Sequence, residues 1–438
     1  MAARADPAGS RPRVLVTGAN GFIGSAFVAD LISEGYEVLA AVRDPARMQR
    51  RFPSVRAVAV DLNTMTAPAD WQTLVRGLDA VVNVAGILQS APGQSAEAVH
   101  THAPKALFRA AADAGVRRIV QVSAVSVDAA SEYARTKAAA DAFLMGLECD
   151  WVVLRPSLVY GRRAYGGTAL MRALAVVPFA VPLVGAGDQA FQPIHVRDLC
   201  KTLIWAIRSD DAAGALVQPC GPERLDMRDI LALYRAWLGR PEARFVPVPR
   251  PLVAGLCRLG DFFGSGPLRT TSLVQIEHGN LADPAEFEAR TGIVARPMAE
   301  MLEREPSATG ELWQARGVLV RPLVRASLVL LWLVSGLLGL MAPTGESAAW
   351  FSALGVPNAL HGVLAKAAGA GDLAIAFLLA TGLRPTLTAW AQLALISGYT
   401  LALTIAAPDL WGDLFGPLLK NIPIAALVVV DRILSEER

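Results

Sequence analysis

The first 160 residues alternate short apolar runs with longer stretches of mixed polarity. Six runs are continuously apolar, a pattern typical of strands buried on both faces of a parallel sheet. They read RVLVT, EVLAAV, VRAVAV, AVVNVA, RIVQVS and WVVLRP. Residues 21–33, 96–114 and 132–147 lie between these runs and are predicted helices. Strands alternating with helices predict an α/β fold built on a doubly wound parallel sheet, the Rossmann arrangement.

The rest of the chain divides into three parts of different composition. Residues 161–305 are richer in proline and glycine, and we expect them to complete the first domain, 1–305, on its substrate side. Residues 306–322 have the composition of a linker. The last part, 323–438, holds four apolar segments, at about 323–342, 359–383, 386–407 and 414–434. Each is close to the ~20 residues that a helix needs to cross a bilayer.

Charged residues are scarce in this last part. Between residues 326 and 430 they are Glu346, Lys366, Asp372, Arg384, Asp409, Asp413 and Lys420. The alternative is a set of short hydrophobic helices buried in a soluble core. Four segments in succession with so few charges favour a four-helix transmembrane bundle, and hence an integral membrane protein. Asp372 should face the bundle interior, where a structural pair with Lys366 or Lys420 is favoured over a role in binding a polar head group or carrying a proton.

Arginines gather on one side of the four predicted spans. They are Arg316, Arg321, Arg325, Arg384, Arg432 and Arg438. The loops on the opposite side carry acids instead. The positive-inside rule then predicts a multi-pass protein of the inner (cytoplasmic) membrane, with the first domain and both termini in the cytoplasm. The N-terminal residues include no apolar run of the kind found in secretory signal peptides.

Charge and cysteine content argue against several classes of function. The net charge is only +2 and no basic run is interleaved with aromatic residues, so nucleic acid is not an expected partner. The four cysteines form no CxxC pair and have no nearby histidine at ligand spacing. We therefore predict neither a metal site nor a disulfide framework.

A glycine-rich turn follows the first predicted strand and precedes a helix. Gly18 can adopt the angles needed to leave the strand sharply, Gly21 lets the backbone approach a diphosphate, and Gly24 lets the helix pack closely. The helix N-terminus then presents N–H groups and a partial positive charge to the phosphates. The residues predicted to bind the cofactor here are Thr17, Gly18, Asn20, Gly21, Phe22, Ile23 and Gly24.

The end of the second predicted strand bears on the choice of cofactor. A site that prefers NAD commonly has an acid there for the ribose 2′-hydroxyl. Positions 39–42 are instead Leu, Ala, Ala and Val, and Arg43 follows. A guanidinium suits a 2′-phosphate, so NADP(H) is favoured over NAD(H). A solvated surface arginine is the alternative interpretation, and Asp44 next to it complicates the choice.

Residues 13 to about 300 resemble the short-chain dehydrogenase/reductase (SDR) superfamily. They are most similar to its extended and atypical members, which include the accessory NAD(P)-binding subunit of respiratory complex I. The motifs are TGANGFIG at 17–24, NVAG at 83–86, YARTK at 133–137, LRPSLVYG at 154–161 and PIHVRDL at 193–199. The resemblance implies further cofactor contacts: Asp61 and Leu62 at the adenine, Val84, Ala85 and Gly86 behind the cofactor, and Pro156 beside the nicotinamide.

Tyr133 and Lys137 are the predicted catalytic pair. They are four residues apart, so they share one face of a helix. A lysine ammonium should lower the pKa of the neighbouring phenol from its usual ~10 and can also hydrogen-bond the nicotinamide ribose. Tyr133 would then pass a proton to or from the substrate oxygen during hydride transfer. Ser123 and Ser126 are both candidates to bind that oxygen, and either could instead bond to local backbone.

The last 120 residues resemble the DoxX-like membrane family, through motifs such as FGPLLKNIP at 415–423. The two resemblances together imply a membrane-anchored NAD(P)H-dependent oxidoreductase acting on a carbonyl or alcohol of a lipid-soluble small molecule. The alternative is an NAD(P)-binding membrane protein without turnover, with an assembly or redox-sensing role. Residues 250–263 are apolar with basic flanks, which fits either a helix on the membrane surface or a core helix.

Overall fold

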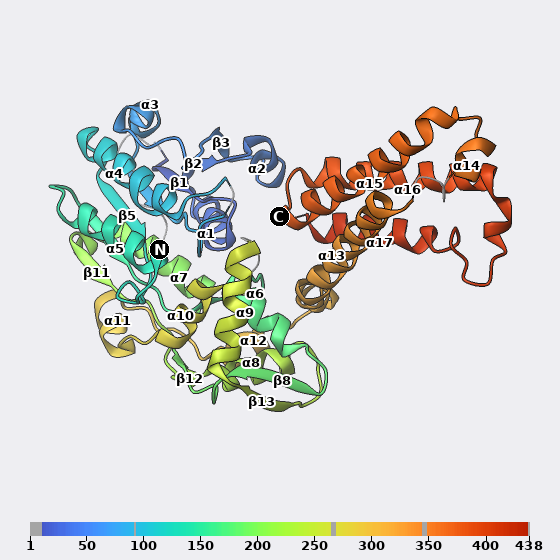
Figure 1. Cartoon of the computed structure of the whole chain (residues 1–438). Coiled ribbons are helices and arrows are strands. Elements are labelled where there is room, and N and C mark those ends of the chain that lie inside the picture. Colours follow the sequence, from blue (N-terminus) through green and yellow to red (C-terminus); the bar gives the residue numbers. More distant parts are fainter. Residues whose placement is uncertain (1–10, 92, 264–268, 344–347, 437–438) are drawn as a thin grey trace. The chain divides into compact units, whose positions relative to one another are not determined.

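The computed structural model describes residues 11–91, 93–263, 269–343 and 348–436. By its internal contacts the chain divides between Ala315 and Arg316 into two compact units. The first contains the α/β fold, and the described residues of the second form helices joined by turns and loops (Figure 1). The two units are described separately below.

A seven-stranded parallel sheet forms the centre of the first unit. Its strand order is β11-β6-β5-β4-β1-β2-β3, so β1 lies next to β4 and the chain winds outward in both directions. This is the doubly wound sheet that the apolar runs predicted. The strands are β1 (Arg13–Thr17), β2 (Glu37–Val42), β3 (Arg56–Ala59), β4 (Ala80–Asn83), β5 (Arg118–Val122), β6 (Trp151–Leu154) and β11 (Ala215–Val217).

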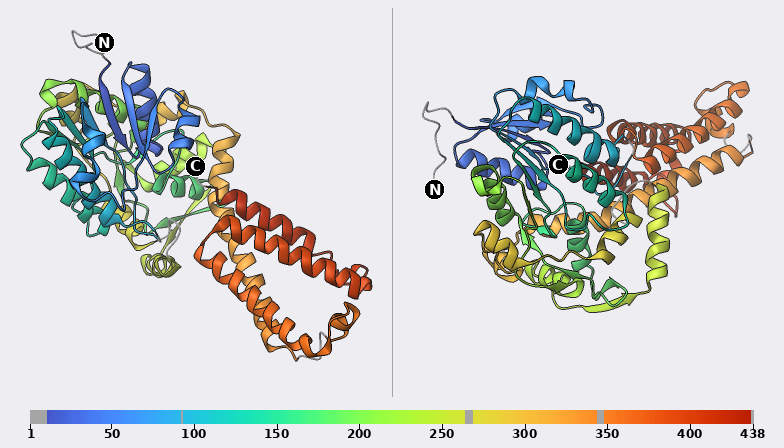
Figure 2. Two further views of the ribbon diagram at one scale, coloured as in Figure 1. Left: turned by 90° about the horizontal axis from the view of Figure 1, so that it is seen from above. Right: turned by 90° about the vertical axis from the view of Figure 1, so that its left-hand side faces the viewer.

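Both faces of the central strands are covered by helices, and because successive side chains of a strand point to opposite faces, each face has its own core. Val14 and Val16 of β1 belong to the core under α1 and α7, whereas Leu15 belongs to the core under α4 and α5. Figure 1 shows these helix pairs on opposite sides, and Figure 2 shows the same layers from two further directions. The helices are α1 (Phe22–Ser33), α4 (Ala103–Asp113), α5 (Glu132–Met145) and α7 (Val196–Arg208), with α2 (Pro45–Arg51) and α3 (Gln72–Val75) beside the sheet.

Most of the chain from residue 159 to residue 305 builds a smaller layer with a separate core, whereas α7 and β11 belong to the layers of the main sheet. Three two-stranded pairings contribute to it, and only the pairing of β9 with β12 is antiparallel. The strands are β7 (Val159–Tyr160), β8 (Ala180–Val184), β9 (Ala190–Phe191), β10 (Ile194–His195), β12 (Leu225–Asp226) and β13 (Arg244–Val248). The helices are α6 (Gly167–Ala175), α8 (Met227–Trp237), α9 (Arg250–Phe263), α10 (Thr270–His278), α11 (Pro284–Thr291) and α12 (Met298–Arg304).

Among the described residues, three helices are long and apolar enough to cross a membrane, and the first of them begins shortly before the second unit. They are α13 (Thr309–Met341), α15 (Asn358–Thr381) and α16 (Pro385–Ala406). The segment 306–322, expected as a linker, is helical from Thr309 onward, because good helix formers outnumber Gly310, Gly317 and Pro322 in it. The short helix α14 (Ala348–Ala353) joins α13 to α15.

The fourth expected span, 414–434, differs from its prediction. Regular helix begins only at Asn421, so α17 (Asn421–Leu434) has 14 residues, fewer than a straight crossing needs. A 3₁₀ turn (Pro408–Trp411) and further turns precede it. Pro408, Gly412 and Gly416 interrupt the helix here, and Gly416 has a φ of +51°.

Asp372 is buried inside the helical unit, as expected, but the predicted pairing with Lys366 or Lys420 is wrong. Its two carboxylate oxygens accept hydrogen bonds from Ser335 Oγ, at 2.6 Å, and Tyr399 Oη, at 3.0 Å. Lys366 instead donates to the carbonyl oxygens of Leu340 and Ala342. The last carbonyls of a helix lack intrahelical partners, so they attract the ammonium group.

Candidate active site

The glycine turn joins β1 to α1 at the carboxyl edge of the sheet. Gly18 has a φ of +65°, and a Cβ there would lie 2.8 Å from the Cα of Ala85. A Cβ on Gly24 would collide with the Gly18 carbonyl oxygen. The protein's own backbone therefore excludes a side chain at both positions. Gly21 is exposed, and a Cβ there would meet only the Gly18 oxygen, at 3.1 Å.

The N-terminus of α1 is open to an anion. Gly21 is its N-cap residue, no side chain caps it, and its first turn holds no acid. The first N–H groups of a helix lack intrahelical partners and carry the positive end of the helix dipole. Asn20 is exposed in the turn, while Phe22 and Ile23 are half-buried and pack on the core. These features fit the diphosphate of a dinucleotide.

A buried chain of polar side chains holds three strand ends together behind this turn. The Thr17 hydroxyl donates to Asn83 Oδ1, and Asn83 Nδ2 donates to Gln121 Oε1 at 2.7 Å. These residues end β1 and β4 and lie within β5. The hydroxyl of Thr17, a residue predicted to contact the cofactor, is thus engaged within the protein and positions the turn.

Lys137 lies beside the backbone segment that follows β4. It is only 3% exposed, and its Nζ donates to the carbonyl oxygens of Val122, at 2.9 Å, and Ala85, at 3.2 Å. A Cβ on Gly86 would lie 3.3 Å from the same Nζ. Burial lowers the pKa of Lys137 to about 8, although the nearby Asp141 acts in the opposite direction.

Tyr133 lies one turn before Lys137 on α5. We expected Lys137 to lower the pKa of the phenol. In the structure burial dominates, aided by the negative charge of Asp141, and raises the pKa of Tyr133 to about 12. Within the described part of the chain, no hydrogen bond engages the Tyr133 hydroxyl. The phenol is therefore protonated at neutral pH and free to donate.

His100 lies beside the candidate site, and the sequence motifs did not single it out. It lies in a short π-helix (Ala98–His102) before α4 and is 1% exposed. Its Nε2 accepts from the Ile87 N–H at 2.9 Å, and its Nδ1 is 2.9 Å from Thr136 Oγ1. Burial and the Lys137 charge lower the pKa of His100 to about 2, so the imidazole is neutral.

Both candidate serines are engaged elsewhere. Ser123 Oγ donates to the buried carboxylate of Asp141 at 2.8 Å, which also accepts from Arg155 Nε at 2.9 Å. Ser126 Oγ donates to Gln275 Oε1 of α10 at 2.5 Å. Among the described residues, neither hydroxyl bonds to Tyr133.

Arg43 stands exposed just after β2, where the sequence placed it. With the Gln94 amide turned to its better orientation, Gln94 Oε1 accepts from Arg43 Nη1 at 2.6 Å. Asp44 caps α2 by accepting from the Arg47 N–H at 2.9 Å. The acid next to Arg43 is therefore committed to a helix terminus.

The other predicted cofactor residues lie along the same sheet edge. Asp61 is exposed after β3, and hydrogen bonds from Asn63 lower the pKa of its carboxyl group. Leu62 beside it is half-buried. Val84, Ala85 and Gly86 follow β4, and Pro156 follows β6.

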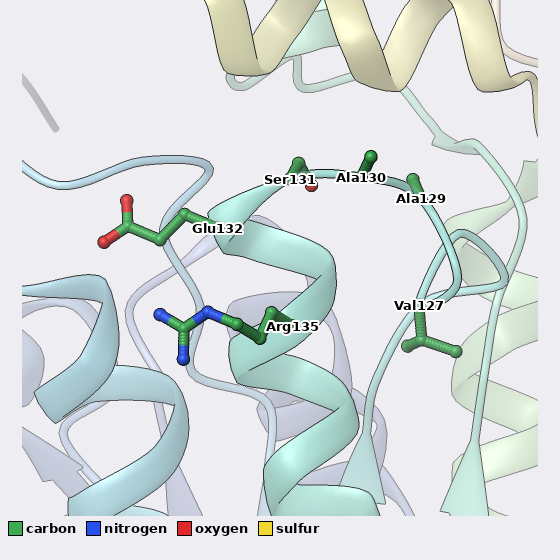
Figure 3. Close-up of a pocket in the computed structure, with 6 residues that line it drawn as sticks. All are labelled: Val127, Ala129, Ala130, Ser131, Glu132 and Arg135. Atoms are coloured by element: carbon green, nitrogen blue, oxygen red, sulfur yellow. The ribbon is translucent and has the colours of Figure 1, made fainter.

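A shallow hollow of about 530 Å³ adjoins the start of α5 (Figure 3). It lies next to the helix that carries Tyr133, at the opposite end of the β5–α5 loop from Ser123. Its lining residues are Val127, Ala129, Ala130, Ser131, Glu132 and Arg135. Across the described residues, no three His, Cys, Asp or Glu side chains lie close enough to hold a metal ion.

Comparison with known families agrees with both units. Residues 14–217 match the model of the NAD dependent epimerase/dehydratase family, and residues 329–429 match that of the DoxX-like family. The chain therefore joins an NAD-binding domain of the epimerase/SDR type to a DoxX-like membrane domain. A fold of this type is that of an oxidoreductase or a related enzyme.

Individual relatives share the first unit. Subunit 9 of the NADH dehydrogenase [ubiquinone] 1 alpha subcomplex from Mus musculus is 27% identical over 284 residues, which cover 61% of this chain and 71% of that protein. Ceramide reductase from Caulobacter vibrioides is 28% identical over 197 residues, or 44% and 61% of the two chains. MoeE5, solved with UDP-glucose and NAD, has the same fold with a TM-score of 0.52 at 23% identity, covering 70% of this chain and 99% of its own.

Proposed function

We propose that this protein is a membrane-anchored, NADPH-dependent oxidoreductase of the SDR type, which transfers hydride between the cofactor and a carbonyl or alcohol of a lipophilic substrate. One observation carries the proposal. Lys137 and Tyr133 lie one turn apart on α5. The Lys137 ammonium donates a hydrogen bond to the Ala85 carbonyl oxygen, and the Ala85 backbone packs against Gly18 of the glycine turn. The proton donor and the dinucleotide turn thus share one edge of the sheet.

The protonation states favour reduction over oxidation at neutral pH. NADPH, when bound, supplies the hydride. Tyr133, with its pKa near 12, holds the proton that a carbonyl oxygen needs as it becomes an alcohol. Lys137 remains mostly charged at pH 7, and two of its three N–H bonds are directed at backbone oxygens. The third is available to a cofactor hydroxyl.

Preference for NADP(H) over NAD(H) rests on Arg43. It is exposed after β2, where the ribose 2′-position of a dinucleotide would lie, and Asp44 is occupied as a helix cap. The test is titration of the purified protein with both nucleotides. Arg43→Ala should weaken NADPH binding about tenfold and leave NADH binding unchanged. Arg50→Ala, an exposed arginine of α2, is the matched control.

The lipophilic substrate and the location are supported by the second unit and by the relatives. A catalytic domain tethered to membrane helices meets substrates that dissolve in the bilayer, and ceramide reductase is named for a lipid substrate. Arg316, Arg321 and Arg325 precede or open the first span, and Arg384 lies between α15 and α16. From the positive-inside rule we propose that the first unit and the loop between α15 and α16 face the cytoplasm and that the helices lie in the inner membrane. A cytoplasmic C-terminus further requires residues 408–434, which include the short helix α17, to return across the bilayer after α16.

A second candidate is an NAD(P)-binding membrane protein without turnover. Two observations favour it. Ser123 is bound to Asp141 and Ser126 to Gln275, which leaves Tyr133 without a serine partner for the substrate oxygen. The relative from Mus musculus is named as a subunit of a larger complex. On this alternative the nucleotide stabilises an assembly or reports redox state.

The deciding experiment measures binding and turnover separately on the full chain in detergent. NADPH oxidation is followed against quinones, sterol ketones and lipid aldehydes. Tyr133→Phe should lower turnover by roughly 10²–10⁴-fold with little change in NADPH affinity, because it removes only the proton donor. Tyr165→Phe, at an exposed position, is the control. NADPH binding without turnover on any substrate would support the second candidate, and no binding of either nucleotide would exclude both.

A further inference from the structure

Helix α9 carries an apolar stripe that the first unit leaves uncovered. Leu252, Leu256 and Leu259 are 57%, 50% and 54% exposed. Their spacing of four and three residues places them on one helix face. Cys257, on the opposite face, is 2% exposed. The sequence left open whether this segment is a core helix or a surface helix, and the exposed leucines exclude burial of this face in the core of the unit.

The polar groups of α9 are sorted between the two faces. Asp261 is directed at α10, where it accepts from Arg269 Nε at 3.1 Å and from the hydroxyl of Thr270. Arg258 is exposed on the flank of the leucine stripe rather than within it. Arg250, at the first turn, lies on the same side of the helix as Cys257 and pairs with Glu277. The apolar stripe is therefore bordered by one exposed positive charge, that of Arg258.

Helix α10, on which α9 packs, is fastened to the loops of the candidate active site. Gln275 bridges Ser126 and Ser131, the residue that caps α5. His278 pairs with Asp128 at 2.9 Å, and Arg269 donates to the Ser90 carbonyl at 2.7 Å. The exposed stripe thus lies on the outer helix of a layer that borders the site.

We propose that the outward face of α9 docks on the surface of the bilayer, with Leu252, Leu256 and Leu259 in the headgroup region and Arg258 on anionic lipid phosphates. An exposed apolar stripe with an arginine on its flank is the pattern of a helix that lies in the membrane interface. The chain supplies that membrane itself, through three helices able to span it. The proposal does not depend on whether the site turns over.

The test uses the full chain in lipid nanodiscs, with a fluorophore on a cysteine introduced at Leu256. Val294, 64% exposed in the same unit, is the matched control position. Cys149, which is partly accessible, is replaced by alanine, and the three buried cysteines are kept. The quencher is a nitroxide on the lipid headgroup.

Docking predicts that quenching at Leu256→Cys exceeds that at Val294→Cys by about threefold or more. Arg258→Glu should reduce this difference in nanodiscs that contain anionic lipid and leave it unchanged in purely zwitterionic ones. Equal quenching at both positions would overturn the proposal. So would fluorophore self-quenching at position 256 that rises with protein concentration in detergent, because a second copy would then cover the stripe.

Discussion

His100 and Tyr133 meet edge to face, with ring centroids 5.4 Å apart and planes at 88°. The contact joins the π-helix before α4 to the first turn of α5. His100 also accepts a hydrogen bond from the Ile87 N–H and lies within hydrogen-bond distance of the Thr136 hydroxyl. One neutral imidazole therefore contacts both the loop after β4 and helix α5, which carries Tyr133 and Lys137. A π-turn often marks a functional site, and here it directs a histidine inward.

This arrangement predicts acid sensitivity. The pKa of His100 is about 2 in the folded chain, against 6.5 for an ordinary histidine. Below pH 6.5 the unfolded chain binds a proton that the folded chain does not, so the free energy of unfolding falls as the pH falls. The loss should reach about 2 kcal/mol at pH 5. His100→Gln should remove it, as measured by melting temperatures between pH 7 and 5.

The control for that measurement is His102→Gln. His102 lies two residues away with its side chain 57% exposed, so its replacement should leave the pH dependence of melting as it is. If His100→Gln and the parent protein lost stability equally on acidification, His100 would not be the neutral, buried group described above.

The two candidate serines should differ in their effect on stability. Ser123→Ala removes a hydrogen bond from Asp141, which is fully buried and has a second oxygen without a partner among the described residues. Leaving a buried carboxylate less satisfied should cost about 1–3 kcal/mol. Ser126→Ala should cost less, because Gln275 keeps its bond to Ser131. The melting temperatures of the two variants test this prediction. A larger loss of stability in Ser126→Ala than in Ser123→Ala would contradict the hydrogen-bond network around Asp141.

The glycine turn predicts a steric effect on cofactor binding. Gly24→Ala places a methyl group against the Gly18 oxygen and 2.9 Å from the Cα of Ala19, so α1 must move away from the turn. NADPH affinity should fall by about tenfold or more, because the N-terminus of α1, which would bind the diphosphate, is displaced when the helix moves. Gly167→Ala in α6, where a Cβ meets nothing within 4 Å, should bind like the parent protein. Unchanged affinity in Gly24→Ala would show that the turn does not hold the diphosphate.

Two glycines of α15 provide a matched pair in the helical unit. A Cβ on Gly369 would lie 2.9 Å from the Leu340 nitrogen of α13, whereas one on Gly371 meets nothing within 4 Å. Gly369→Ala should therefore separate the two helices and cost about 1–3 kcal/mol. Gly371→Ala should be neutral or stabilising, because alanine favours helix. Thermal unfolding in detergent compares the two, and equal melting temperatures would argue against the close crossing.

Much of the fold follows from local pattern. Continuous apolar runs predict strands covered on both faces, and the structure buries Val14, Leu15 and Val16 on alternate faces of β1. The placement of Tyr133 and Lys137 on one face of α5 follows from helical spacing alone. The apolar segments of α13, α15 and α16 were visible because length and lack of charge define a span. The fourth span was overestimated, because composition does not reveal where turns begin.

Partners of individual side chains were the weakest predictions. Asp372 accepts hydrogen bonds from Ser335 and Tyr399 rather than pairing with a lysine. Ser123 and Ser126, near Tyr133 in the sequence, donate hydrogen bonds to Asp141 and Gln275. Ser126 and Gln275 are 149 residues apart in the sequence. No local periodicity encodes such a contact, so spacing arguments could only name candidates.

The amino-acid order alone was enough to establish a dinucleotide-type α/β unit followed by membrane helices, because both depend on short-range regularities of apolar and glycine positions. The folded chain alone decided which groups are buried together. It placed His100 against Tyr133 and raised the phenol pKa where helical spacing had suggested a decrease. Desolvation depends on everything that surrounds a group, and that environment exists only once distant segments have packed.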